Sequence, residues 1–134
     1  MLSTLEHLKR VREILALPEH WTQGNYGTRV PVRLAPGQLS QADLAVPIPL
    51  ASCFCLHGAW AKVAMENGEG FQAAINHFPF QVALGDCVPG EAGFDEKGDL
   101  ITIANVVTFN DAPGRTHEEI LAVLDCAIKK HAGD

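Results

Sequence analysis

Residues 52–66, SCFCLHGAWAKVAME, constrain the fold more than any other part of the chain, because they are almost all apolar or small. His57 and Lys62 are the main polar interruptions. A helix with so few polar positions must be covered by other elements on most of its sides. Gly58 and the alanines of this stretch allow neighbouring helices to approach closely. We therefore predict a buried helix over residues 52–66 that other helices wrap.

The start of the chain is typical of an amphipathic helix. Ser3 and Glu6 have the spacing of a capping box, in which a serine side chain and a glutamate satisfy the free amides of a helix start. Leucine and valine then recur at helical intervals until Pro18, which cannot continue a helix. We predict a helix over residues 3–17 with one apolar face.

The end of the chain predicts a second capped helix. Thr116 and Glu119 repeat the capping-box spacing, and Lys129, Lys130 and His131 lie in the last turn, where the helix dipole favours cations. The segment before it, LITIANVVTF at residues 100–109, is ambiguous. Its β-branched residues favour a strand, whereas its apolar spacing is compatible with a helix.

The remaining segments are expected to be loops with short elements. Prolines and glycines interrupt residues 22–50, which predicts a long loop with one short strand over residues 28–34. A helix is predicted over residues 69–77 and a turn or short helix over residues 80–85. Residues 85–99 contain four glycines and carry a net charge of −4, so we predict an exposed acidic loop there.

Length and composition predict one mainly α domain spanning residues 1–134. A chain of 134 residues can bury about two thirds of its unfolded surface without help from metals or disulfides. We expect a compact bundle of four to five helices with long loops and one short β-hairpin. Hydrophobic residues make up 47% of the chain and charged residues 19%, so part of the apolar surface is expected in the core or in an interface.

The charge and the absence of long apolar stretches exclude two classes of function. The net charge of −6 has the wrong sign for a protein that binds phosphate backbones, so no nucleic-acid partner is expected. No apolar stretch approaches the roughly 20 residues needed to cross a membrane. The start of the chain does not look like a signal peptide. We expect an acidic, soluble protein of the cytoplasm and leave a homo-oligomer open.

Cys53, Cys55, Cys87 and Cys126 show no spacing typical of a disulfide framework. Cys53 and Cys55 lie in an apolar run, where we interpret them as buried, unreactive thiols that act as small hydrophobic side chains. Cys53, Cys55 and His57 spell C-x-C-x-H, which suggests zinc. On a helix, however, Cys55 would point away from the other two side chains, and no second pair of ligands follows. A cysteine nucleophile would need a nearby histidine as its base, and nothing in the spacing selects one. We therefore expect no metal and no cofactor.

The stretch FNDAPGRTHEEI at residues 109–120 places an amide, charged side chains and an imidazole around a Pro-Gly turn. Its proline, glycine and threonine are explained by a turn followed by a helix cap. Asn110 and Asp111 are common turn residues, and Arg115 could pair with Asp111 to fix the turn. Together with His117, these side chains form either a structural joint or a polar recognition edge.

Two aromatic residues near the first helix are further candidates. Trp21 and Tyr26 follow that helix in a glycine-containing segment. They could plug the core beneath the long loop, or they could anchor a partner, since tryptophan and tyrosine are enriched in binding hot spots.

Three segments together resemble a known family: LPEHWTQGNYG (17–27), FCLHGAWAKVA (54–64) and FNDAPGRTHEEILAVLDCAIKK (109–130). The chain is similar to an uncharacterised family of small bacterial and phage proteins, a domain of unknown function. Its pattern is Trp-Thr-x-Gly, then Cys-x-x-Gly-Ala, then Asn-Asp-x-Pro-Gly-Arg-Thr. The resemblance implies a mainly helical domain and favours a helix over residues 100–109, but it implies no reaction or ligand. Residues 28–50 and 79–98 depart from the pattern.

The sequence leaves two hypotheses about function. The leading one is a non-enzymatic module that binds a protein, of bacterial or phage origin and with a regulatory role, in which the acidic loop could dock a basic partner. The alternative is a small hydrolase or transferase with a polar site around Asp111, Arg115 and His117. The candidate binding residues are Trp21, Tyr26, Asn110, Asp111, Arg115 and His117.

Overall fold

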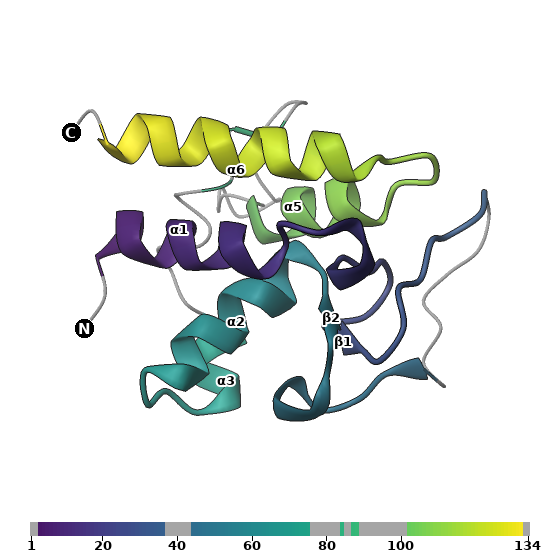
Figure 1. Cartoon of the computed structure of the whole chain (residues 1–134), viewed down its shortest axis with the longest axis horizontal. Coiled ribbons are helices and arrows are strands. Elements are labelled where there is room, and N and C mark those ends of the chain that lie inside the picture. Colours follow the sequence, from purple (N-terminus) through teal and green to yellow (C-terminus); the bar gives the residue numbers. More distant parts are fainter. Residues whose placement is uncertain (1–2, 37–43, 76–83, 85–86, 89–101, 133–134) are drawn as a thin grey trace, which may run out of the picture.

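The computed structural model describes residues 3–36, 44–75, 84, 87–88 and 102–132 (Figure 1). The α-helices in these residues are α1 (Thr4–Ile14), α2 (Leu56–Glu66), α3 (Phe71–Ile75), α5 (Thr102–Asp111) and α6 (His117–Ala132). Two 3-10 turns, η1 (Pro18–His20) and η3 (Ile48–Leu50), and two strands, β1 (Gly27–Thr28) and β2 (Cys53–Phe54), accompany them. The fold is mainly α with one short antiparallel β pair, which confirms the predicted fold class.

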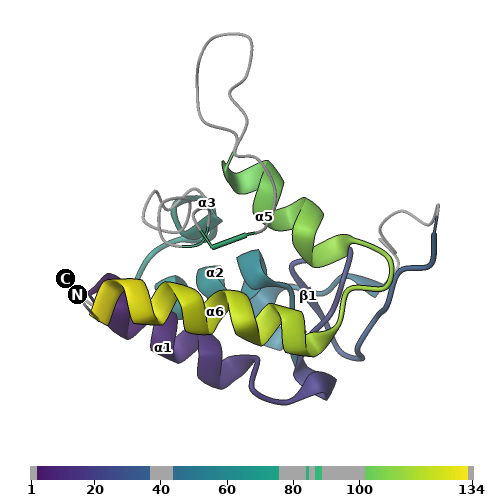
Figure 2. The ribbon, with the colours of Figure 1, turned by 90° about the horizontal axis from the view of Figure 1, so that it is seen from above.

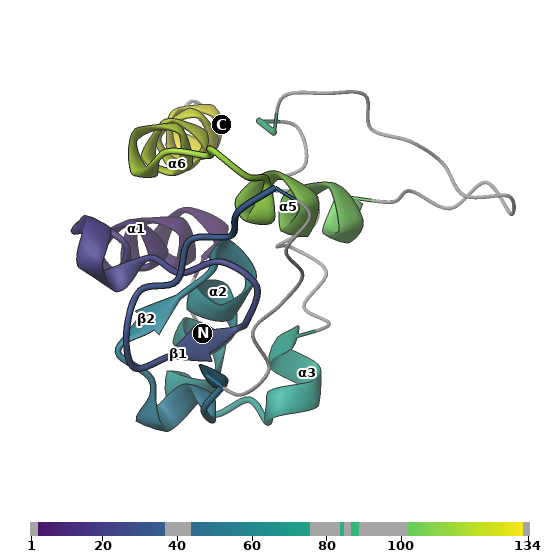
Figure 3. The ribbon, with the colours of Figure 1, turned by 90° about the vertical axis from the view of Figure 1, so that its right-hand side faces the viewer.

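Helix α2 lies at the centre of the structure, as its apolar sequence predicts. It packs against α1, α3 and α5, and Figure 3 shows these helices and the β pair arranged around it. Eight of its eleven residues are buried. The His7 ring of α1 stacks on the Trp60 ring, with centroids 3.7 Å apart, and His7 Nε2 lies 2.9 Å from the Trp60 carbonyl oxygen. The predicted burial of this helix is confirmed.

Helices α1 and α6 join the two ends of the chain. They run side by side in opposite directions, so the start of α1 and the end of α6 lie at the same end of the molecule (Figure 2). Leu8 and Val11 of α1 and Leu124 of α6 are buried in the core. An ion pair between Arg12 Nε and Asp125 Oδ1, 3.0 Å long, lies at the exposed edge of this contact.

The predicted helix caps are present at both ends. Ser3 is the N-cap of α1 and accepts a hydrogen bond from the Glu6 amide. Thr116 and Glu119 exchange hydrogen bonds between their side chains and amides at the start of α6. Helix α1 ends at Ile14, three residues before the predicted end at residue 17.

Residues 102–109, the described part of the ambiguous segment before the last turn, are helical and belong to α5. Val106, Phe109 and Asn110 are all buried, and their i, i+3, i+4 spacing places them on one helical face. A strand would have sent Phe109 and Asn110 to opposite sides. This packing against α2 outweighs the β propensity of the segment's valines, isoleucines and threonines.

The prediction of one helix over residues 52–66 is wrong at its start. Cys53 and Phe54 form β2, which pairs with β1 in the register Gly27 to Phe54 and Thr28 to Cys53. Helix α2 begins only at Leu56, and Cys55 is its N-cap, because the Cys55 thiol sulfur accepts a hydrogen bond from the Gly58 amide at 3.2 Å. The strand predicted over residues 28–34 is likewise limited to its first residue, Thr28.

Several predictions fall partly or wholly on residues outside those described. The predicted helix over 69–77 corresponds to α3, and residues 76–77 lie outside the described ranges. The predicted turn over 80–85 and the acidic loop over 85–99 also lie outside, apart from Leu84, Cys87 and Val88.

The cysteine spacing did not predict that two of the four cysteines form a disulfide. Cys87 and Cys126 form a disulfide, with Cα atoms 5.9 Å apart, that ties the segment before α5 to α6. They are 39 residues apart in the sequence, so only the folded chain brings them together. Cys53 and Cys55 are free and buried. The cytoplasm is a reducing compartment, in which disulfides are uncommon. The disulfide therefore gives no support to the cytoplasmic location, which stays a prediction.

Reducing the Cys87–Cys126 disulfide is expected to lower the free energy of unfolding by about 2 to 4 kcal/mol, because the bond restricts the unfolded chain. Urea unfolding with and without dithiothreitol measures this difference. The Cys126→Ser variant is the control, and its unfolding should not respond to the reductant. Equal midpoints for oxidised and reduced wild-type protein would contradict the prediction.

Candidate functional site

The three segments that carry the family resemblance, residues 17–27, 54–64 and 109–130, meet at one buried asparagine, Asn110. Asn110 Oδ1 accepts hydrogen bonds from the Trp21 indole N–H at 2.9 Å and from the Leu56 amide at 3.0 Å. Its Nδ2 donates to the Thr22 carbonyl oxygen at 3.1 Å and to Asp111 Oδ1 at 2.9 Å. The side chain thus joins α5, the start of α2 and the segment after η1.

A neighbouring glutamine completes this contact. Gln23 Nε2 donates to the backbone oxygens of Asn110 at 2.8 Å and Ala112 at 3.0 Å, and Gln23 Oε1 accepts from the Leu34 amide at 2.6 Å. Gln23 is almost completely buried, at 1% exposure. We call the set Trp21, Thr22, Gln23, Leu56 and Asn110 the Asn110 joint. Gln23 was not predicted as a site residue, because a glutamine in a loop carries no local signal of burial.

Arg115 fixes the turn before α6, but with partners other than the predicted Asp111. Its guanidinium lies 3.7 Å from the centre of the Phe109 ring, and its Nε donates to the Phe109 carbonyl oxygen at 2.9 Å. Its Nη1 pairs with Glu119 Oε2 at 2.5 Å. The hydrogen bond from the Thr116 amide, followed by that from Arg115, lowers the pKa of the Glu119 carboxyl.

Trp21 and His117 are also held by contacts within the protein. Trp21 is 1% exposed, and the Arg33 guanidinium covers its ring at 4.0 Å. His117 Nε2 lies 2.6 Å from the Leu15 carbonyl oxygen at the end of α1. This contact ties the first turn of α6 to α1. Trp21, Asn110, Arg115 and His117 therefore have structural partners for their polar groups.

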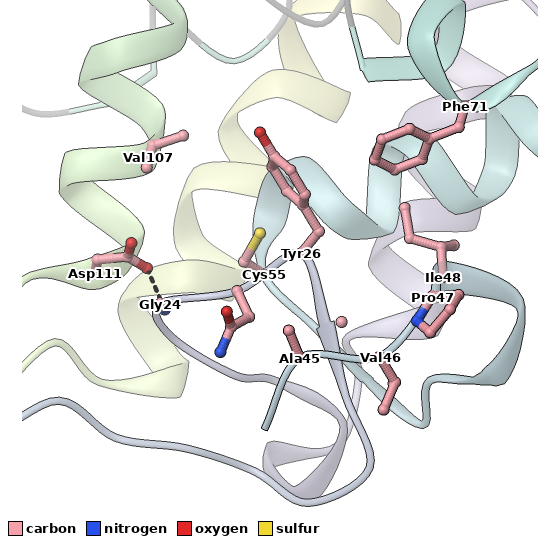
Figure 4. A pocket seen from close by; sticks show the side chains of 12 residues that line it. Gly24, Tyr26, Ala45, Val46, Pro47, Ile48, Cys55, Phe71, Val107 and Asp111 are labelled. Carbon is pink, nitrogen blue, oxygen red and sulfur yellow. Dashed lines mark hydrogen bonds between the residues drawn. The ribbon is translucent and has the colours of Figure 1, made fainter. Parts of the chain in front are cut away.

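The other two candidate residues, Tyr26 and Asp111, border a pocket of about 400 Å³ (Figure 4). In the figure the Tyr26 ring stands between Val107 of α5 and Phe71 of α3, with the Cys55 thiol near its base. Most of the lining is apolar. The lining residues are Gly24, Asn25, Tyr26, Gly27, Ala45, Val46, Pro47, Ile48, Cys55, Phe71, Val107 and Asp111.

Tyr26 takes its position from two close contacts with α2. The Tyr26 ring meets the His57 ring edge to face, with centroids 5.1 Å apart. The Tyr26 backbone runs against Gly58, where an added Cβ would lie 1.8 Å from the Tyr26 carbonyl oxygen. Gly58 is therefore required for this approach, and Tyr26 is left 41% exposed at the pocket.

Asp111 connects the Asn110 joint to the pocket. Its Oδ1 accepts hydrogen bonds from the Gly24 amide and from Asn110 Nδ2, both at 2.9 Å. Gly24 has a φ of 85°, a conformation that glycine adopts without strain and that directs this amide at the carboxylate. No described residue forms a hydrogen bond or ion pair with Asp111 Oδ2.

Several residues that line the pocket were not predicted from the sequence. Phe71 is 46% exposed and Ile48 is buried, and neither belongs to a recognisable motif. Cys55 was considered as a buried thiol, a zinc ligand or a nucleophile, but not as part of a pocket. Cys53 lies in β2 and donates from its thiol to the Glu19 carbonyl oxygen, so Cys53, Cys55 and His57 do not share the helical geometry that the zinc argument assumed.

The Cys55 thiol is poorly suited to act as a nucleophile. Its complete burial raises its pKa from the ordinary value of 9.0 to about 12, which keeps it protonated at neutral pH. The thiolate, and not the thiol, is the reactive form of cysteine. The role that the structure gives this side chain is to cap α2 and to line the pocket.

The raised pKa of Cys55 predicts a loss of stability at alkaline pH. The unfolded thiol ionises near 9.0 and the folded thiol near 12, so stability should hold below pH 9 and fall as the pH rises between these values. Cys55→Ser replaces the capping sulfur with a hydroxyl oxygen, which is a common N-cap acceptor, and removes the ionisation. Between pH 8 and 10.5 the wild type should lose about 2 kcal/mol more than this variant, at about 1.4 kcal/mol per pH unit. Urea unfolding at both pH values measures the difference, and parallel losses in the two proteins would contradict it.

Among the described residues, no group of three or more histidine, cysteine, aspartate or glutamate side chains gathers in a way that could hold a metal ion. No described helix is both long enough and apolar enough to cross a membrane.

Comparison with known proteins places the chain in a family. No curated protein and no solved structure matches it. A family model described as a family of unknown function, DUF6197, matches residues 1–130, which is nearly the whole chain. The match agrees with the resemblance seen in the three sequence segments. The chain therefore belongs to DUF6197, a family of unknown function.

Proposed function

We propose that the protein works by binding another protein, and that the pocket beside Tyr26 receives a side chain of that partner. The pocket's volume of about 400 Å³ lies within the range of roughly 300 to 1,000 Å³ usual for ligand sites. Tyr26 and Phe71, 41% and 46% exposed, stand at its edge. Aromatic side chains of this kind are enriched in protein interfaces.

Of the six candidate residues, only Tyr26 and Asp111 line the pocket, and this difference is the single observation that carries the proposal. Arg115 and His117 are bonded to Glu119, Phe109 and Leu15, away from the pocket lining. The pocket itself combines apolar walls, two half-exposed rings and one carboxylate. Such a lining suits the recognition of an apolar side chain with one polar end.

The same contacts give less support to the alternative, a hydrolase or transferase around Asp111, Arg115 and His117. Such a site requires these groups to converge on a substrate. Asp111 borders the pocket, whereas the guanidinium of Arg115 and the ring of His117 face backbone oxygens of the protein. The nearest thiol, that of Cys55, stays protonated because burial raises its pKa to about 12.

The test compares what three forms of the protein capture from a lysate of the source organism. The double variant Tyr26→Ser with Phe71→Ser removes both exposed rings. Val30→Ser is the matched control, because Val30 is 55% exposed and does not line the pocket. Circular dichroism and urea unfolding establish that both variants remain folded.

We expect the wild type and the Val30→Ser control to capture the same protein and the double variant to lose it. Failure of the wild type to capture any protein, at low and at moderate salt, would overturn the proposal. Retention of the captured protein by the double variant would overturn it as well, because binding would then use another surface.

A further inference from the structure

We infer that the side chain received by the pocket is a lysine of the partner. This inference rests on the proposed function and adds the chemistry of the residue that is bound. It rests on the positions of the Tyr26 ring, the Phe71 ring and the Asp111 carboxylate, which all line the same pocket (Figure 4).

The two rings form an aromatic corner. The Tyr26 and Phe71 ring centroids are 6.2 Å apart, and the ring planes are inclined by 69°. Together with Ile48 and Val107 they give the pocket apolar walls. An alkyl chain packs against such walls, and a cation beside an aromatic face gains roughly 0.5 to 2 kcal/mol. A lysine offers both parts, a four-carbon stem and an ammonium group.

The charge of the pocket is negative and is not neutralised within the described structure. Among the described residues that line the pocket, Asp111 is the only charged one, and none is a lysine, arginine or histidine. Arg115, the nearest basic residue in the sequence, pairs with Glu119 instead. The net charge of the chain, −6, favours the approach of a basic segment at long range.

The geometry of Asp111 favours lysine over arginine. Its Oδ1 already accepts two hydrogen bonds, from the Gly24 amide and Asn110 Nδ2, and these fix the orientation of the carboxylate. Only Oδ2 is without a partner among the described residues. A guanidinium binds best when it engages both oxygens of a carboxylate, whereas an ammonium is a compact point charge that can pair with a single oxygen.

The experiment titrates isotope-labelled full-length protein with three capped amino acids and follows the amide and methyl signals by NMR. The probes are the Nα-acetyl N-methylamides of lysine, arginine and norleucine. Norleucine keeps the alkyl stem of lysine without its charge. Signals of Tyr26, Phe71 and Val107 report occupation of the pocket.

We expect the lysine probe to bind about tenfold more tightly than the norleucine probe, a ratio that corresponds to about 1.4 kcal/mol. The Asp111→Asn variant keeps an oxygen for the Gly24 amide but removes the charge, and it should lose this preference while still binding norleucine. The control Glu118→Gln removes an exposed charge outside the pocket lining and should keep the preference.

The outcomes separate this inference from the proposed function. Equal binding of the lysine and norleucine probes by the wild type would overturn the inference and leave the pocket as a binding site. Tighter binding of the arginine probe would overturn the assignment to lysine. If no probe shifted the pocket signals up to about 50 mM, well above the millimolar dissociation constants of weak ligands, the inference would be overturned, and the lysate test would decide the proposed function separately.

Discussion

Replacing Asn110 with alanine is expected to lower the free energy of unfolding by about 4 kcal/mol or more. The change leaves two buried donors, the Trp21 indole N–H and the Leu56 amide, without their acceptor, and each such group costs about 1 to 3 kcal/mol. The Thr22 carbonyl oxygen loses a donor at the same time. A protein of this size is stable by only about 5 to 15 kcal/mol, so the variant should be close to unfolding. Thermal and urea unfolding measure the effect.

The control for this prediction is Asn67→Ala. Asn67 Nδ2 also donates a hydrogen bond, to the Val63 carbonyl oxygen at 2.8 Å, but Asn67 lies at the exposed end of α2. Its replacement should cost less than about 1 kcal/mol, because water can take the place of the lost donor. Similar losses for the two alanine variants would mean that Asn110 is not the buried centre of the joint.

Replacing Gly58 with alanine is the second change with a large expected effect. The new Cβ would lie 1.8 Å from the Tyr26 carbonyl oxygen and 2.7 Å from its carbonyl carbon, so backbone and not a flexible side chain would have to move. Overpacking usually costs about 1 to 3 kcal/mol, and a clash with backbone belongs at or above the upper end of that range. The higher helix propensity of alanine returns at most about 1 kcal/mol. We expect a net loss of about 3 kcal/mol in urea unfolding.

The matched control is Gly70→Ala. An added Cβ at Gly70 meets nothing within 4 Å, so this change should alter the stability by less than about 1 kcal/mol. A Gly58→Ala protein as stable as the Gly70→Ala protein would show that Tyr26 does not lie against α2. Because Gly58 positions Tyr26, the Gly58→Ala variant should also bind the lysine probe more weakly.

The sequence predicted those features that depend on neighbouring residues. The capping boxes at Ser3 and Thr116 each involve residues three positions apart, so their chemistry can be recognised without a structure. The burial of α2 followed from its lack of polar residues. The start of α2 was predicted wrongly because Cys53 and Phe54 take their strand conformation from pairing with β1, which lies more than twenty residues earlier.

The features that the sequence did not predict depend on contacts between distant residues. Asn110 and Asp111 looked like ordinary turn residues, and only the fold brings Trp21 and Leu56 to the Asn110 side chain. The Cys87–Cys126 disulfide has the same origin. The pocket gathers side chains from α3, α5 and the segments around Tyr26 and Ile48, so no single stretch of sequence contains it.

Asp111 links stability and the proposed binding function. One of its oxygens holds Gly24 and Asn110, and the other has no partner among the described residues at the pocket. Changes at the Asn110 joint that leave the protein folded are therefore expected to act on binding through the position of this carboxylate. Changes at Phe71, which is exposed, are expected to act on binding with little effect on stability.

The central claim is that the polar cluster around Asn110 is a buried structural joint and not an open active site. Hydrogen exchange of the Trp21 indole N–H, followed by NMR and assigned with a Trp60→Phe variant, tests this claim most directly. We predict that this proton exchanges only when the whole protein unfolds, so that its protection matches the free energy of unfolding measured in urea. Exchange that is faster by several orders of magnitude, with the rest of the core still protected, would show that water reaches the joint and would contradict the claim.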